Sequence, residues 1–289
     1  MNLILLSKIF VLSVLFSISL CEVIANRDNP IQNEKGAAFK LMSTIGMKST
    51  IPNGTGTGFA VSPDGHILTA HHVVENADEI SVVFKNKRPQ LAKVMTVHKG
   101  LDIAVLKIRE TPTGFININK NSPDVGDEVF TIGYPAPELL GFNQKFTNGT
   151  VSSLTGMKNA PHSMQISVPV QPGNSGGPLI SGETGYVVGI ITHTVNHRKL
   201  EFNPQNINYA VKSSYALSLL NTTGVNVSSI SLGEQQLLSQ NKSSATLNNG
   251  SSIYSFIGQT DRQTNTKKKK FSTDKVSSAT CLIVSGVFQ

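Results

Sequence analysis

Residues 171–180 read QPGNSGGPLI and place one serine, Ser175, among three glycines and an asparagine, directly before an apolar run. Glycine contributes no packing and loses much entropy when it is ordered, so three of them around one hydroxyl indicate a backbone that must turn tightly. A serine hydroxyl is a weak nucleophile until a base removes its proton. The stretch fits a plain loop as well as a nucleophile turn, and the choice depends on what the rest of the chain brings to Ser175.

Candidates for a base and an acid lie in two other apolar blocks. HILTAHHVV (66–74) carries the adjacent pair His71 and His72 at the end of a predicted strand, and KGLDIAVLKI (99–108) places Asp102 at the head of another. A catalytic imidazole needs an acid that fixes its tautomer, and a carboxylate beside an apolar strand is costly unless it is paired. Taken singly, the histidines also fit a surface pair and Asp102 a turn-capping residue.

The order histidine, aspartate, serine, with separations of 30 and 73 residues, is more specific than any one block. ILTAHHV, LDIAVLKI and PGNSGGPL together resemble the three catalytic blocks of trypsin-like serine proteases. Within that family GTGTGFAVSPDGHILTAHHVV, GDEVFTIGYP and INYAV are similar, in the same order, to the disulfide-free HtrA/Deg branch. Glutamyl endopeptidases and exfoliative toxins share INYAV-like and GNSG-like blocks. The resemblance covers roughly residues 37–216.

The resemblance implies an all-β fold of two six-stranded antiparallel β-barrels with the active site in the cleft between them. Short alternating runs separated by glycine, proline and asparagine between residues 37 and 216 independently favour an all-β sandwich or barrel. One short helix is expected at residues 213–220, after the last strand.

The resemblance also implies roles for individual residues. His72 takes the base position and Asp102 the acid position of a triad completed by Ser175, and the backbone N–H groups of Gly173 and Ser175 form the oxyanion hole. His71 is excluded because neighbouring residues of a strand face opposite sides, so only one of the pair can reach Ser175.

The substrate pocket implied by the resemblance lies along residues 168–172, 192–194 and 208–210, with Val170, Thr192, His193 and Thr194 as its candidate binding residues. Apolar Val168 and Val170 favour small or aliphatic side chains. His193 leaves a glutamyl specificity open, although those relatives carry threonine where Val170 lies. His193 and His197 are four residues apart, but on a strand or loop they need not share a face, so we expect no metal and no cofactor.

The ends of the chain differ from its middle. Residues 1–25 have the charge, apolar core and small-residue site of a secretory signal peptide, and residues 26–36 read as a leader. We expect the protease domain at 37–220 and a disordered Ser/Asn/Lys-rich tail at 221–289, with no recognisable PDZ domain of the kind found in HtrA/Deg relatives. The apolar LIVSGVF (282–288) allows an alternative, in which it docks on the barrel as an extra strand or blocks the cleft.

Charge and cysteines narrow the possible partners and location. The net charge is +7, of which the tail contributes +4, from seven Lys/Arg against three Asp/Glu, so no nucleic-acid groove is expected. After cleavage following Ala25 only Cys281 remains, so no internal disulfide can form. No stretch beyond the signal is long and apolar enough to span a membrane.

Two function classes follow from these observations. The first is a secreted or periplasmic serine endopeptidase that acts on polypeptide substrates through an acyl-enzyme. The second is a catalytically idle binding module on the same fold, because folds of this kind are reused without activity. Neither class fixes an oligomeric state.

Overall fold

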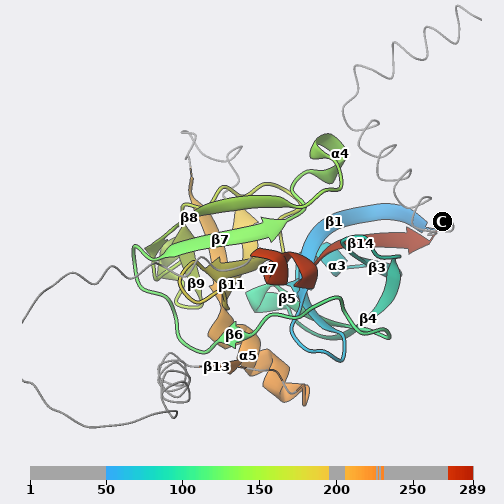
Figure 1. Cartoon of the computed structure of the whole chain (residues 1–289), viewed down its shortest axis with the longest axis horizontal. Coiled ribbons are helices and arrows are strands. Elements are labelled where there is room, and N and C mark those ends of the chain that lie inside the picture. The colour runs from blue at the N-terminus through green and yellow to red at the C-terminus, as the bar shows by residue number, and fades with distance from the viewer. Residues whose placement is uncertain (1–49, 195–205, 226, 228, 231–272, 289) are drawn as a thin grey trace, which may run out of the picture.

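A computed structural model describes residues 50–194, 206–225, 227, 229–230 and 273–288 (Figure 1). The expected signal peptide, the leader and residues 37–49 lie outside the described residues. Within them the chain forms two β-barrels, each built mostly from strands close together in sequence. Figure 1 shows the first barrel around β1 to β5 and the second around β7 to β12.

Six strands close the first barrel in the order β1-β14-β3-β4-β5-β2, and every neighbouring pair is antiparallel. Their bounds are β1 (Thr50–Ala60), β2 (His66–Ala70), β3 (Glu79–Phe84), β4 (Gln90–His98), β5 (Ile103–Ile108) and β14 (Thr280–Phe288). Apolar side chains from β1 to β3, β5 and β14 fill the interior, among them Ile67, Phe84 and Ile283.

The second barrel follows the order β10-β7-β8-β9-β12-β11 and closes through the pairing of β11 with β10. Two short strands, β6 and β13, extend it in parallel from the edge of β11. The bounds are β6 (Ile118–Asn119), β7 (Glu128–Gly133), β8 (Lys145–Ser153), β9 (Ser163–Ile166), β10 (Pro178–Ser181), β11 (Val187–Thr194), β12 (Asn208–Lys212) and β13 (Ser229–Ile230). The expectation of two six-stranded antiparallel barrels is therefore confirmed.

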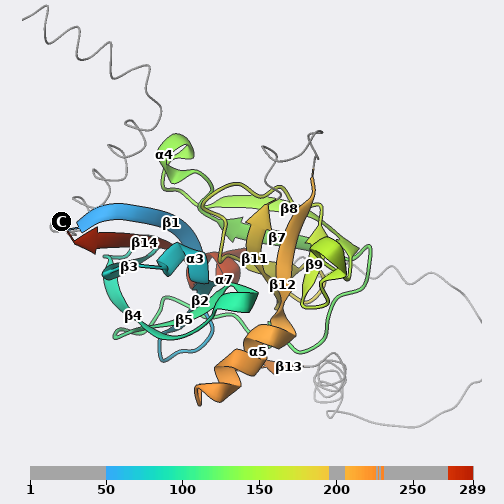
Figure 2. The same cartoon turned by 180° about the vertical axis from the view of Figure 1, so that it is seen from behind.

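Short helices connect and cover the strands. They are α3 (His71–Val74), η1 (Lys99–Leu101), α4 (Pro137–Leu140), η2 (Met157–Asn159), α5 (Ser213–Thr222) and α7 (Thr273–Ala279). The helix expected at 213–220 is α5, which leaves the end of β12 (Figure 2) and buries Ala216, Leu217 and Leu220. One apolar cluster joins the two barrels, since it contains Phe59 and Leu68 of the first and Ile132 and Ile190 of the second.

The expectation of a disordered tail is wrong for residues 273–288. Strand β14 pairs with β1 from Thr50↔Phe288 to Phe59↔Thr280, and on its other side with β3 from Cys281↔Phe84 to Gly286↔Glu79. Helix α7 precedes it and adds Val276 and Ala279 to the cluster between the barrels. The alternative in which LIVSGVF becomes a barrel strand is thus the observed one. Residues 231–272 lie outside the described part of the chain.

The expected domain end at residue 220 also falls short of the observed structure. Helix α5 continues to Thr222, Val225 is buried in the cluster between the barrels, and Ser229–Ile230 pairs with β6. Polar composition concealed these contacts, because a few apolar residues among serines and asparagines suffice to dock a segment on an existing core.

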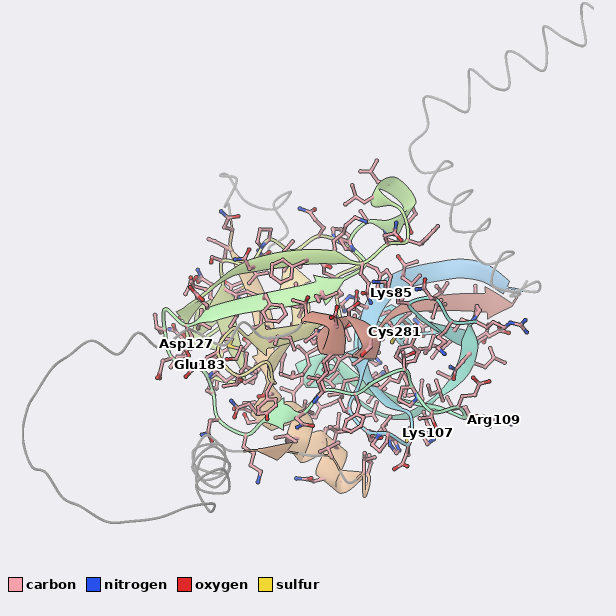
Figure 3. The ribbon with its side chains drawn as sticks, viewed as in Figure 1. Lys85, Lys107, Arg109, Asp127, Glu183 and Cys281 are labelled. Carbon is pink, nitrogen blue, oxygen red and sulfur yellow. The ribbon has the colours of Figure 1, made fainter. Side chains whose placement is uncertain are left out.

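Cys281 is a free, fully buried thiol at the start of β14 (Figure 3). Burial raises its pKa well above the usual range. Burial, together with the neighbouring Cys281, also raises the pKa of Tyr134 to about 12, and Tyr134 packs against Leu282 and Val284 of the same strand. Both side chains therefore stay protonated and uncharged, Cys281 within β14 and Tyr134 packed against it.

We predict that Ile283→Ala destabilises the folded chain by about 2–5 kcal/mol, because it empties a fully buried site in β14. Thermal unfolding should show a drop in Tm of roughly 5–15 °C for a domain of this size. Leu91→Ala on β4 is the matched control, since Leu91 is 64% exposed and its loss should leave the Tm nearly unchanged. Equal Tm values for the two variants would contradict the docking of β14.

A second prediction concerns alkaline pH. The folded chain keeps the protons of Cys281 and Tyr134, whose pKa values are raised by burial, while the unfolded chain releases them from about pH 9 upward. Stability should therefore fall as pH rises above about 9. Tm should be measured from pH 7 to 10.5 for Cys281→Ala and for the unsubstituted chain. The amount by which the variant's Tm lies below that of the unsubstituted chain should narrow as pH rises, because the variant no longer carries the thiol. A deficit that stays constant with pH would rule out this linkage.

Candidate active site

His72 and Asp102 are brought together by the pairing of β2 with β5. Ala70, the last residue of β2, lies opposite Ile103, the first of β5, so the residues that follow β2 and precede β5 meet at one edge. His72 Nδ1 lies 2.7 Å from Asp102 Oδ2, and the backbone N–H of His72 donates to Oδ1 at 2.9 Å. One carboxylate therefore fixes both the ring and the backbone of His72.

The local backbone around Asp102 holds it in this position. Asp102 ends η1 in the left-handed region, at φ 55° and ψ 45°, and its carbonyl accepts from the N–H of His71 at 3.1 Å. At the start of η1 the ring nitrogen Nδ1 of His98 accepts from the N–H of Leu101 at 3.1 Å. The sequence offered no signal for this contact beyond a histidine three residues before Leu101.

The histidine pair lies in helix α3 and not on a strand, which corrects the reason given for choosing between its members. Strand β2 ends at Ala70, and successive residues of a helix point about 100° apart. His71 is buried, whereas the side chain of His72 is 43% exposed. Only His72 contacts Asp102 through its ring in the hydrogen bonds described above.

The turn that carries Ser175 packs against the first barrel. The Ser175 carbonyl accepts from the N–H of Thr57 in β1 at 2.9 Å, and the N–H of Gly176 donates to Ile191 in β11. Gly176 has φ +84°, and a Cβ there would collide with the Thr57 carbonyl and the Ala70 N–H. Glycine is therefore required, and its close approach brings the turn to the end of β2, where His72 follows two residues later.

The peptide between Pro172 and Gly173 is held from the second barrel. Ala136 N–H donates to the Pro172 carbonyl at 2.7 Å, while the Gly173 carbonyl accepts from the Thr57 hydroxyl at 2.7 Å. In a trans peptide the C=O and N–H point in opposite directions, so the Gly173 N–H faces away from Ala136. Gly173 has φ +94°, and a Cβ there would collide with the Tyr134 carbonyl.

Thr57 is a site residue that the sequence reading missed. It is fully buried, its hydroxyl donates to the Gly173 carbonyl, and the same oxygen accepts from Tyr134 N–H at 3.1 Å. With its backbone bond to Ser175, it ties β1 to three positions of the second barrel. The signal was one of two threonines in the glycine-rich GTGTGFA, since a buried hydroxyl requires a partner.

The candidate pocket residues lie in three segments that the second barrel brings together. Val170 packs in one cluster with Ile191 and Ala210, and Thr192 is 4% exposed. Asn208 Nδ2 donates to the Val168 carbonyl at 2.7 Å, which joins the first and third segments expected at the pocket. The backbone of His193 pairs with Tyr209 and that of Thr194 with Asn208, while the side chains of both lie outside the description.

The described residues show neither a candidate metal centre nor a candidate membrane-spanning helix. Within the described ranges no group of three or more His, Cys, Asp or Glu side chains gathers closely enough to hold a metal ion, and His197 lies outside them. No helix in the same part of the chain is both long and apolar enough to cross a bilayer.

Comparison with known proteins agrees with this architecture. Residues 56–190 match the family described as Trypsin-like peptidase domain. A probable periplasmic serine endoprotease DegP-like of Pseudomonas savastanoi pv. phaseolicola is 42% identical over 141 residues, which cover 47% of this chain and 28% of that protein. The chain spans about a third or less of the length of the curated relatives it matches.

Two solved structures share the fold. The serine endoprotease from Yersinia pestis superimposes with a TM-score of 0.51 at 33% identity, over 59% of this chain and 58% of that one. The HtrA-type protease AlgW with a decapeptide superimposes with a TM-score of 0.51 at 26% identity, over 58% and 51% of the two chains. Residues 56–190 therefore resemble a trypsin-like peptidase domain, and the chain is similar in sequence and fold to HtrA-type serine endoproteases.

Proposed function

We propose that the chain is an exported serine endopeptidase that hydrolyses peptide bonds with His72, Asp102 and Ser175 as its catalytic triad. The observation that carries this proposal is the 2.7 Å contact between His72 Nδ1 and Asp102 Oδ2, at the strand end against which the Ser175 turn packs. Export rests on the signal-like residues 1–25 and on relatives named as periplasmic. The substrates are polypeptides, as the activity in the relatives' names implies.

The chemistry follows from the roles of the three side chains. His72 Nε2 takes the proton of the Ser175 hydroxyl while Oγ forms a bond to the scissile carbonyl carbon. The same imidazolium then gives its proton to the leaving amine as the C–N bond breaks, which leaves an acyl-enzyme. A water molecule attacks this ester by the same route in reverse and releases the carboxylate product. Asp102 holds the ring and stabilises its positive charge throughout.

The backbone N–H groups of Gly173 and Ser175 supply the oxyanion hole in this proposal. The supporting observation is that the Pro172 carbonyl is bonded to Ala136 and the Gly173 carbonyl to Thr57, so neither is available to fill the hole. Donors that are fixed before the reaction stabilise developing charge without reorganisation, and this is usually the largest catalytic contribution.

The specificity that fits the pocket best is for small or aliphatic side chains. Val170 and Val168 are apolar and packed in one cluster with Ile191, and Thr192, the residue after Ile191, is buried. A glutamyl specificity would require His193 to bind a carboxylate. Cleavage of a peptide library distinguishes the two, since products ending in alanine, valine or leucine support the first and products ending in glutamate the second.

We predict that Ser175→Ala abolishes peptide hydrolysis with little change in Tm. Loss of a triad member lowers turnover by a factor on the order of 10⁴ to 10⁶. The measurement is the initial rate on a peptide substrate, with fluorophosphonate labelling of the unsubstituted chain as the companion assay. A variant that retains activity within tenfold, or a chain whose Ser175 takes no label, would favour the idle binding module.

The histidine pair gives an internal control. His72→Ala should lose as much activity as the serine variant, because it removes the base, while His71→Ala should retain most of its activity because only its backbone N–H contacts Asp102. Initial rates of the two variants, each with its Tm, decide the assignment. An inactive, folded His71 variant beside an active His72 variant would reverse it.

A further inference from the structure

Gln144 connects the C-terminal segment to the loop between β7 and β8. Its side-chain Nε2 donates to the carbonyls of Ser277 and Thr280 at 3.0 and 3.1 Å, and its Oε1 accepts from the Ser277 hydroxyl at 2.5 Å. The two chain positions are more than 130 residues apart. The carbonyls of Ser277 and Thr280 lie at the last turn of α7 and the first residue of β14, so Gln144 caps the junction between these elements.

The other end of the same loop holds the oxyanion turn. Residues 134–144 run from Tyr134, whose N–H is bonded to Thr57, through Ala136, whose N–H is bonded to Pro172, to Gln144. Ala136 adopts φ 39° and ψ 60° immediately before Pro137, a left-handed conformation that alanine rarely takes. A non-glycine residue in this region is strained and persists only when its surroundings hold it.

The C-terminal segment contacts this loop on both sides of Ala136, at Tyr134 and at Gln144. Val276, Ala279, Leu282 and Val284 are all at most 2% exposed, and the last two pack against the Tyr134 ring. The neighbouring Gln144 side chain also acts against the rise in the pKa of Tyr134 caused by burial. Both ends of the loop thus rest on residues 273–288, Tyr134 through packing and Gln144 through hydrogen bonds.

We propose that residues 273–288 form an activating element of the proposed protease, with Gln144 as the positioning residue that fixes the 134–144 loop and, through Ala136 N–H, the Pro172–Gly173 peptide of the oxyanion turn. The inference rests on the proposed function. Turnover then depends on a segment that lies more than 95 residues beyond Ser175 in sequence and contributes no group to the chemistry. Release of the segment would free the peptide to rotate its N–H out of the hole.

The test compares Gln144→Ala, Ser277→Ala and their double variant with Asn143→Ala as the matched control, an exposed residue of the same loop. Gln144→Ala should lower kcat about tenfold, because it removes the three hydrogen bonds that hold this end of the loop. KM should stay within about twofold, because the oxyanion hole acts on the transition state. Ser277→Ala should show a smaller loss of kcat, Ser277→Thr should restore it, and the double variant should be no worse than Gln144→Ala.

Two more measurements separate positioning from unfolding. Tm of each variant should lie within a few degrees of the unsubstituted chain, and alkylation of buried Cys281, followed by peptide mapping, should accelerate in parallel with the loss of kcat. Unchanged kcat in Gln144→Ala, or an effect on KM alone, would overturn the inference. A loss of kcat in Ser277→Thr as large as that in Ser277→Ala would also count against the inference. A chain that shows no Ser175-dependent hydrolysis in any form would instead overturn the proposed function.

Discussion

The buried hydroxyl of Thr57 is the contact on which the site depends most. It joins the Gly173 carbonyl to the Tyr134 N–H, and the backbone of the same residue holds the Ser175 carbonyl. Strand β1 therefore serves both as a wall of the first barrel and as the anchor of the Ser175 turn from the second. Any displacement of β1 must move the turn, because buried polar groups cannot give up their partners without a cost of about 1–3 kcal/mol each.

Strand β1 in turn is fixed by what flanks it. On one side lies β2, which leads into His72, and on the other lies β14 from the far end of the sequence. Without β14 both β1 and β3 would expose an unpaired edge to solvent, with the apolar interior of the barrel open between them. Pairing of residues more than 200 positions apart, such as Gly54 with Ser285, also means that the barrel closes only after its last strand has been made.

The sequence predicted the parts of the molecule that depend on local pattern. Alternating runs and turn residues placed the strands, and the blocks around His72, Asp102 and Ser175 came from the resemblance to trypsin-like proteases. It gave β14 only as an alternative to a disordered tail, because TCLIVSGVF follows a long polar stretch and pattern alone does not say which sheet an apolar run will join. Thr57, Ala136 and Gln144 were missed for a related reason, since each acts through backbone or amide contacts that only the assembled barrels create.

Two strained residues show how each barrel positions one part of the candidate site. Asp102 and Ala136 are both non-glycine residues at positive φ, at 55° and 39°. Asp102 stands where β5 begins and orients the imidazole, whereas Ala136 stands just after β7 and orients the Pro172–Gly173 peptide. Each is held by its own barrel, and Thr57 joins the two sides. The geometry of the candidate site is thus set by barrel packing, including that of the C-terminal strand, more than by the residues that would perform the chemistry.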